Sequence, residues 1–315
     1  MKGVSCSREK CLYKMKSFFR NLIRVEWNIG FVENSEDLLE REKLQIHWMK
    51  HSYSKGWFAD PFILEVTETE IILLVEEYQY LSDLGCISKL VVERNSFKLK
   101  SVKRILQIES HLSFPAIFKY ENQLYIYPEN CQMGKLKLYS YDKITDIVTP
   151  LSVWCEEPLT DAALCICSGR PFLFSTKRPK QNGADLDIYA SVGEKPSEWS
   201  FYHAQTVHFK DNVARNAGLS FYWKNELMRP AQDCNKGYGK GIVIQNIYQD
   251  ESGFTFKEVK RFFPSSLKWK EGLHTFNVYN EIIVVDGRRY PYPMFARIYR
   301  IVRYFIKIGS NKLKR

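Results

Sequence analysis

The sequence predicts an all-β protein, a five-bladed β-propeller with a short amphipathic helix at each terminus. Aromatic residues make up 15% of the 315-residue chain, and long helical patterns are scarce in its middle. Five stretches look like imperfect copies of one motif. The copies recur roughly every 50 residues, which is within the range expected of propeller blades.

Each copy opens with a small or polar residue and continues into an apolar strand, a short turn and a second apolar run. That second run ends in a polar cluster, such as Glu76-Glu77 in the first copy and Asp286-Gly287-Arg288 in the last. The opening stretches of the five copies are residues 57–63, 113–117, 160–164, 216–220 and 272–276. In a closed ring, the five polar clusters would converge on one central pocket.

The domain boundaries follow from this repeat. We expect a basic amphipathic helix over residues 1–24, the propeller over residues 25–290, and a basic amphipathic helix with a tail over residues 291–315. The blades are expected near residues 44–92, 113–141, 160–191, 216–248 and 272–287. Residues 44–50 are expected to be the first strand of the first blade. The last blade is short, and residues 25–33 are expected to complete it and close the ring.

The net charge of +10 belongs to the two ends of the chain. Residues 1–24 carry seven Lys/Arg and one acidic residue, and residues 288–315 carry nine Lys/Arg and no acidic residue. The body from 25 to 287 therefore sums to −5, which argues against a nucleic-acid partner. Basic helices with apolar stripes suit an anionic membrane surface, so we expect a cytoplasmic protein, peripheral at the inner face of the membrane. Alternatively, each helix packs its apolar stripe on the body.

The eight cysteines form no CxxC pair and have no zinc spacing, so we expect neither a metal nor a cofactor. Small buried thiols in a reducing compartment are the simplest interpretation. Basic residues interrupt the apolar residues near the N-terminus, so no secretory signal is expected, and no 18-residue apolar run is present.

A family resemblance rests on the ordered motifs WFADPF, SFPAIF with YPEN, TDAAL, RNAG with RPAQDC, and GLHT with VVDG. Together they resemble the N-terminal β-propeller module of glucosamine inositolphosphorylceramide transferases and its bacterial relatives, over about residues 45–288. The resemblance implies a role in glycolipid or surface-glycan assembly. The plant enzymes join this module to a separate glycosyltransferase domain, for which this chain is too short, so a glycosyltransferase is one expected partner.

More distantly, the chain is similar to the five-bladed propellers of glycoside hydrolases such as arabinanases and fructosidases. Those enzymes carry an Asp before the Pro of the first blade, a second Asp in blade two and an acid Glu in blade three. Asp60 matches the first position, Phe114 occupies the second, and Asp161 is the nearest candidate for the third. We expect the catalytic pair to be Asp60 with either Asp161 or Glu129. Carboxyl groups that lie close together raise the pKa of at least one of them, and a general acid requires such a raised pKa.

The other candidates are the polar and aromatic residues at the blade motifs. Sugar hydroxyls need mixed donors and acceptors, sugar rings need apolar faces, and arginines recognise phosphate or carboxylate. The expected substrate-binding residues are Trp57, Glu77, His111, Lys177, Arg215, Arg229, Gln232, Asp233, His274, Asp286 and Arg288. For most of them a structural role is equally expected.

Three functions remain open at this point. The first is a carbohydrate-active propeller in glycolipid or surface-polysaccharide biosynthesis that transfers or processes a sugar at a central pocket lined by acids and arginines. The second is a non-catalytic glycan-binding or scaffold module that recruits a separate glycosyltransferase. The third is a glycoside hydrolase. The sequence does not decide whether the protein is an enzyme.

Overall fold

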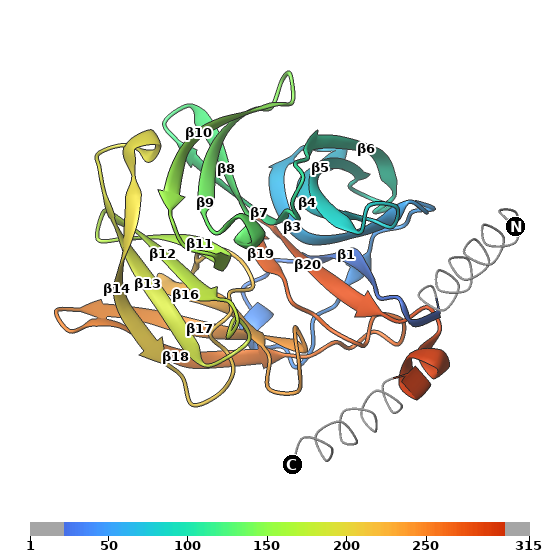
Figure 1. Cartoon of the computed structure of the whole chain (residues 1–315). Coiled ribbons are helices and arrows are strands. Elements are labelled where there is room, and N and C mark those ends of the chain that lie inside the picture. The colour runs from blue at the N-terminus through green and yellow to red at the C-terminus, as the bar shows by residue number, and fades with distance from the viewer. Residues whose placement is uncertain (1–21, 300–315) are drawn as a thin grey trace, which may run out of the picture. The chain divides into compact units, whose positions relative to one another are not determined.

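The computed structural model describes residues 22–299, and this part of the chain contains twenty strands in five four-stranded sheets (Figure 1). The sheets form the five blades of a β-propeller, so the predicted all-β fold is confirmed. One compact unit comprises residues 27–287. A second unit comprises the two ends of the chain and is described separately below.

Each of the first four blades is built from four consecutive strands. The first two blades contain β3 (Gly56–Val66), β4 (Glu70–Gln79), β5 (Leu84–Glu93), β6 (Leu99–Leu106), β7 (Ser113–Tyr120), β8 (Gln123–Glu129), β9 (Leu136–Asp142) and β10 (Ile147–Cys155). The third and fourth contain β11 (Leu159–Cys167), β12 (Arg170–Lys177), β13 (Asp185–Val192), β14 (Ser200–His208), β15 (Phe221–Trp223), β16 (Glu226–Asp233), β17 (Gly241–Asp250) and β18 (Gly253–Phe262). Short 3₁₀ turns occur at Leu38–Glu40, Cys131–Met133 and Pro196–Glu198.

The fifth blade is assembled from both ends of the propeller, in the order β19 (Phe276–Tyr279), β20 (Ile282–Arg289), β1 (Glu26–Glu33) and β2 (His47–Trp48). Figure 1 shows the orange strand β20 beside the blue strand β1. This arrangement protects the edges that an open ring would leave.

The expectation that residues 44–50 begin the first blade is wrong. Within this segment His47 and Trp48 pair with Phe31 and Gly30 of β1, so β2 is the outer strand of the fifth blade. Packing explains the difference, because Leu44 lies in a buried cluster with residues of the fourth and fifth blades. Gly30 permits the close approach: a Cβ there would lie 2.4 Å from Ile46 Cγ2.

The core lies between the blades, so a central strand is buried on both faces. Leu73, Leu74 and Val75 in β4 are all 0% exposed. Leu73 packs in a cluster with Val284 of the fifth blade, whereas Leu74 packs in a cluster with Ile126 of the second. Successive residues of a strand face opposite neighbours, which is why these strands are continuous apolar runs.

The innermost strands of the first three blades carry a β-bulge at the same place. Asp60, Phe114 and Asp161 have φ values of 49°, 44° and 45°, and the strand pairing shifts register at each of them. The left-handed conformation is uncommon for residues other than glycine, although Asp adopts it more readily than Phe. A bulge redirects a side chain, and here it places Asp60 and Asp161 among the polar residues described below.

The second compact unit contains residues 1–26 and 288–315, of which 22–26 and 288–299 are described. Two nitrogens of Arg289 donate to Glu26 Oε2 at 2.9 and 2.7 Å. Residues 293–299 are helical, and the rest of the predicted C-terminal helix lies outside the described residues, as does the predicted N-terminal helix apart from its last residues. Across residues 22–299, no helix has the length and hydropathy that a bilayer crossing requires.

Candidate functional site

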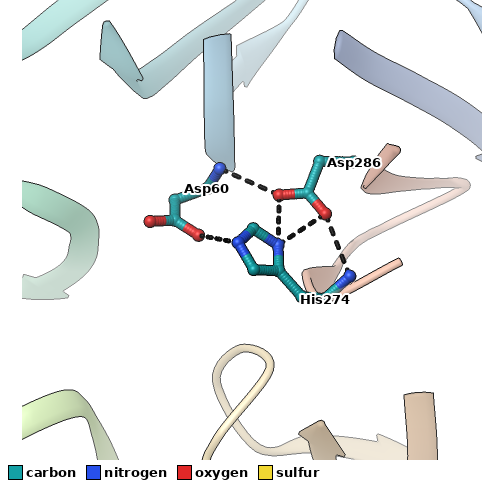
Figure 2. Close-up of side chains that lie close together, drawn as sticks. All are labelled: Asp60, His274 and Asp286. Atoms are coloured by element: carbon teal, nitrogen blue, oxygen red, sulfur yellow. Dashed lines mark hydrogen bonds and ion pairs between the residues drawn. The ribbon is translucent and has the colours of Figure 1, made fainter. Parts of the chain in front are cut away.

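Asp60, His274 and Asp286 form a contiguous polar cluster contributed by the first and fifth blades (Figure 2). A carboxylate oxygen of Asp286 lies 2.6 Å from His274 Nδ1, and Asp286 Oδ1 also accepts hydrogen bonds from the backbone N–H groups of His274 and Thr275. These contacts fix the orientation of the imidazole. Its Nε2 atom lies 3.7 Å from Asp60 Oδ1, so the ring stands between the two carboxyl groups.

The cluster is enclosed by further contacts between blades. The indole of Trp27 stacks on the imidazole of His274, with ring centroids 3.9 Å apart. Asp60 Oδ2 accepts the backbone N–H of Phe114 at 3.0 Å, and the backbone N–H of Asp60 donates to Asp286 at 3.1 Å. The Asp60 side chain therefore links the first blade to the second, and Asp286 links the fifth to the first.

Burial and charge set the protonation of this cluster. Burial raises the pKa of Asp60 to about 7; Asp161, Glu76 and Asp286 add to the rise, and His274 opposes it. Burial alone would lower the pKa of His274, but the Asp286 carboxylate raises it above its usual value. Burial alone would raise the pKa of Asp286, but His274 and the backbone donors lower it. Near neutral pH, an imidazolium–carboxylate pair thus stands beside a carboxyl group that exchanges its proton.

A second cluster centres on Asp161 in the third blade. Asp161 Oδ2 accepts from Arg215 Nε at 2.6 Å and from Gln232 Nε2 at 2.8 Å, and the backbone N–H of Asp161 donates to Glu129 at 2.9 Å. Burial, together with the nearby Asp161 carboxyl group, raises the pKa of Glu129 to about 8, although Arg215 opposes the shift. Gln232 Oε1 is buried and, within residues 22–299, has no hydrogen-bond partner.

Tyr238 connects the two clusters. Its ring centroid lies 4.7 Å from the Arg215 guanidinium carbon and 5.2 Å from the centroid of the His274 ring. The same ring meets Trp27 edge to face at 6.3 Å. Tyr238 lies in a turn between two glycines with positive φ, Gly237 and Gly239. The carboxyl groups of Asp60 and Asp161 therefore belong to one site with an aromatic wall.

Asp60, His274 and Asp286 also offer ligand atoms that lie within 4.8 Å of one another. One imidazole nitrogen and two carboxylate oxygens suit a divalent cation. Binding through imidazole requires the neutral ring, so a cation would compete with the proton that the His274–Asp286 pair holds.

Several residues expected at the pocket instead make contacts elsewhere. Glu77 lies on the opposite side of β4 from Glu76, and its carboxylate accepts from Tyr53, Ser88 and Arg104 at 2.6, 2.6 and 3.1 Å. Glu76 is not among the predicted site residues, but it raises the pKa of the Asp60 carboxyl group electrostatically. The alternation of side chains along a strand is the signal that separates the two glutamates.

The remaining expected residues surround the two clusters or lie apart from them. His111 Nε2 lies 3.2 Å from Glu76, while its Nδ1 accepts the backbone N–H of Gly85. Lys177 pairs with Glu157 at 2.8 Å. Three others are Trp57, which stacks on Tyr78, Asp233, which pairs with Arg261, and Arg288, which lies two residues beyond Asp286 near the end of β20.

Arg229 is 1% exposed and does not extend toward either cluster's carboxylates. Its guanidinium donates to Asn216 Oδ1 at 2.8 Å, to Gln245 Oε1 at 2.6 Å and to the backbone carbonyls of Val213 and Ala214. Burial lowers its pKa to about 9. Arg229 thus fixes residues 213–216, the segment that contains Arg215, and so helps to position Arg215 beside Asp161.

Sequence reasoning missed Trp27 and Thr275 at this site. Thr275 directly follows His274, and its Oγ1 lies 3.1 Å from Asp60 Oδ1 and 2.9 Å from Asp286 Oδ2, so the motif GLHT contained a signal for it. Trp27 precedes the first motif by thirty positions, and only ring closure brings it to His274.

Comparisons with known proteins agree with the motif resemblance. A family profile described as "Glucosamine inositolphosphorylceramide transferase 1, N-terminal" matches residues 46–281. Glucosamine inositolphosphorylceramide transferase 1 of Oryza sativa subsp. japonica is 29% identical over 204 residues, which cover 62% of this chain and 27% of the rice protein. The match thus spans about a quarter of the length of that relative.

A solved structure shares the fold. An endo-1,4-beta-xylanase from Bacteroides thetaiotaomicron superposes with a TM-score of 0.52 at 13% identity, covering 70% of this chain and 84% of the xylanase. A thermostable family-43 glycoside hydrolase superposes with a TM-score of 0.49 at 12% identity, covering 68% of this chain and 81% of that enzyme. The profile match extends over most of the chain and bears out the resemblance carried by the motifs. The chain therefore belongs to the family of the N-terminal domain of glucosamine inositolphosphorylceramide transferase 1.

Proposed function

We propose that this protein is a carbohydrate-active propeller of glycolipid or surface-polysaccharide biosynthesis, and that it transfers or processes a sugar at the Asp60–His274–Asp286 and Asp161–Arg215 clusters. Its relatives are named for transfer of glucosamine to inositolphosphorylceramide, which supports a glycolipid context. One observation carries the catalytic part of the proposal. A carboxyl group with a pKa of about 7, Asp60, faces the Nε2 atom of an imidazole whose orientation Asp286 fixes.

The proposed chemistry uses Asp60 as a general acid. Near neutral pH a protonated Asp60 donates its proton to the leaving oxygen as the bond from that oxygen to the anomeric carbon breaks. The oxygen of an acceptor hydroxyl or of water bonds to that carbon and passes its proton to the Asp161 carboxylate. Release of the proton gained by Asp161 to solvent, and uptake of a proton from solvent by Asp60, restore both carboxyl groups for the next turnover. Arg215 Nε donates a charge-assisted hydrogen bond to Asp161 Oδ2 at 2.6 Å and so fixes the position of this carboxyl group.

A non-catalytic glycan-binding module is the second candidate, and two observations favour it. Phe114 occupies the second-blade position equivalent to Asp60 and packs edge to face on Phe62, so this position has no carboxyl group. Gln232 Oε1 is a buried acceptor without a partner in residues 22–299, which a sugar hydroxyl would satisfy. In this role the protein would hold a glycan for a separate glycosyltransferase.

The discriminating experiment compares the purified chain with Asp60→Asn. Both are incubated with nucleotide sugars, acceptor glycolipids and aryl glycosides, and products are identified by mass spectrometry; binding of short glycans is measured by calorimetry. Asp146→Asn is the matched control, because the side chain of Asp146 is only 6% exposed but lies in a turn of the second blade, where it pairs with Lys89 and Lys103.

A catalytic site requires that Asp60→Asn abolish product formation while glycan binding and the Asp146→Asn activity persist. Release of sugar to water, rather than transfer, would identify the hydrolase alternative. Glycan binding without turnover in the wild-type chain would refute catalysis and establish the binding module. Neither turnover nor binding with any of these compounds would refute the carbohydrate assignment.

We also propose that the chain ends contact an anionic membrane at its cytoplasmic face. Met294, Phe295 and Ile298 in the helix of residues 293–299 are 71%, 48% and 53% exposed, and basic residues accompany them. The six cysteines within the described part of the chain are all free thiols, in keeping with a reducing compartment.

A further inference from the structure

A groove with a strongly positive lining lies on the first blade, apart from the Asp60 and Asp161 clusters. Its volume is about 360 Å³, and residues 50–55 and 98–102 line it. The lining contains four lysines and no acidic residue: Lys50, Lys55, Lys98 and Lys100. This local charge stands out because residues 25–287 as a whole carry a net charge of −5.

The backbone holds two of these lysines against each other. Lys50 and Lys98 are partners in a parallel β-bridge, with Lys50 N donating to Phe97 O at 2.8 Å and Leu99 N donating to Lys50 O at 3.0 Å. Lys100 follows Lys98 by two positions, at a β-bulge between Leu99 and Ser101, and lines the same groove. Like charges at paired positions destabilise a sheet, so an anion between these ammonium groups would relieve a repulsion that the fold itself imposes.

The charge of the groove is only partly neutralised within the protein. Lys100 Nζ contacts Glu70 Oε1 at 2.5 Å. Lys50, Lys55 and Lys98 have no carboxylate partner among residues 22–299. The hydroxyl groups of Ser52, Ser54 and Ser101 also line the groove and add neutral hydrogen-bond donors to the ammonium groups.

We propose that this groove binds a phosphate-bearing ligand. A phosphate presents more acceptor oxygens and more charge than a carboxylate, which matches three ammonium groups and several hydroxyl groups better. Lysine binds phosphate as a point charge and does not need the planar geometry that arginine imposes. The phosphate belongs either to a soluble phosphorylated compound or to a lipid headgroup. This site does not depend on the function proposed for Asp60 and Asp161.

The test uses the full chain and the double variant Lys50→Ser/Lys98→Ser. Inorganic pyrophosphate serves as the soluble probe in calorimetry and thermal-shift measurements. Phosphatidylcholine vesicles containing phosphatidic acid serve as the lipid probe in sedimentation. The control is Lys210→Ser/Lys257→Ser, which removes the same charge from exposed positions elsewhere on the propeller.

We expect the groove variant to bind pyrophosphate about tenfold or more weakly, to lose its thermal shift, and to retain the wild-type fold. The control should bind as the wild type does, and binding by the wild type should weaken as salt is added. If only vesicle binding depends on Lys50 and Lys98, the phosphate is that of a lipid. If neither probe distinguishes the groove variant from its control, or if neither binds the wild type, the groove is not a phosphate site.

Discussion

The ionisation of Asp60 makes the stability of this protein depend on pH in a way that a single substitution isolates. Burial raises the pKa of this carboxyl group from 3.8 to about 7. In the unfolded chain it ionises near its usual pKa, so between these values only the folded state holds the proton. The stability that protonated Asp60 contributes is therefore fully present below its pKa in the unfolded chain. It is lost as the pH rises through the pKa of Asp60 in the folded protein. Asp60→Asn removes this loss, because the amide does not ionise.

The magnitude follows from the shift. Each pKa unit corresponds to about 1.4 kcal/mol, so raising the pH from about 5 to about 8 should cost the wild type about 3 kcal/mol through Asp60, with little further change at higher pH. The substitution also alters hydrogen bonds to Phe114 and Thr275, but that difference does not depend on pH. The variant should therefore gain about 3 kcal/mol relative to the wild type over this range.

Urea denaturation followed by tryptophan fluorescence at several pH values measures this difference. Asp146→Asn is the control with the opposite expectation. Burial would raise the pKa of Asp146, but Lys103 and Lys89 lower it to about 2. The stability that ionised Asp146 contributes is lost only as the pH falls through its folded pKa. Between about pH 5 and pH 8 the free energy of unfolding of this control should therefore differ from that of the wild type by a constant amount. Parallel profiles for the wild type and Asp60→Asn would refute the protonation scheme on which the general acid depends.

Three further outcomes are expected. Arg229→Leu should lower the free energy of unfolding by about 3 kcal/mol, because the partners of the guanidinium lose their donor in a buried site; urea titration measures it, and an unchanged midpoint would contradict this role. Phe114→Ala should cost about 3 kcal/mol through the cavity left beside Phe62, and a smaller loss would indicate that relief of the left-handed strain compensates. Deleting residues 292–315 should abolish sedimentation with anionic liposomes at low salt, and retained sedimentation would exclude the C-terminal segment as the membrane contact.

The site was harder to predict from the sequence than the fold, for reasons that particular residues illustrate. The pair Glu76-Glu77 marked the correct strand end, but the choice between the two depended on which face of β4 meets the centre. Glu77 lies against Tyr53, Ser88 and Arg104, while Glu76 acts on Asp60. Alternation along β4 places the two glutamates on opposite sides, but the register of the bulged neighbouring strand decides which side meets the centre, and only the fold fixes that register.

Two arginines of the fourth blade also show that contacts at the site are hard to predict from the sequence. Arg215 and Arg229 are the first residues of the fourth-blade motifs RNAG and RPAQDC, and both suited an anionic ligand. In the folded chain Arg215 contacts the Asp161 carboxylate at 2.6 Å, whereas Arg229 satisfies backbone carbonyls and amide side chains. A guanidinium binds whichever acceptors the assembled blades bring to it, and those acceptors come from distant segments of the chain.

The sequence by itself determined the propeller, because five apolar repeats at similar spacing can bury their faces only against one another in a closed ring. It also singled out Asp60, His274 and Asp286, which occupy polar ends of those repeats. Only the tertiary structure decided that β2 completes the fifth blade, that Trp27 covers His274, and which of several acids lose contact with water. Hydrophobic pattern is local and repeats along the chain, whereas strand register, ring closure and the protonation of a buried carboxyl group depend on contacts between residues far apart in sequence.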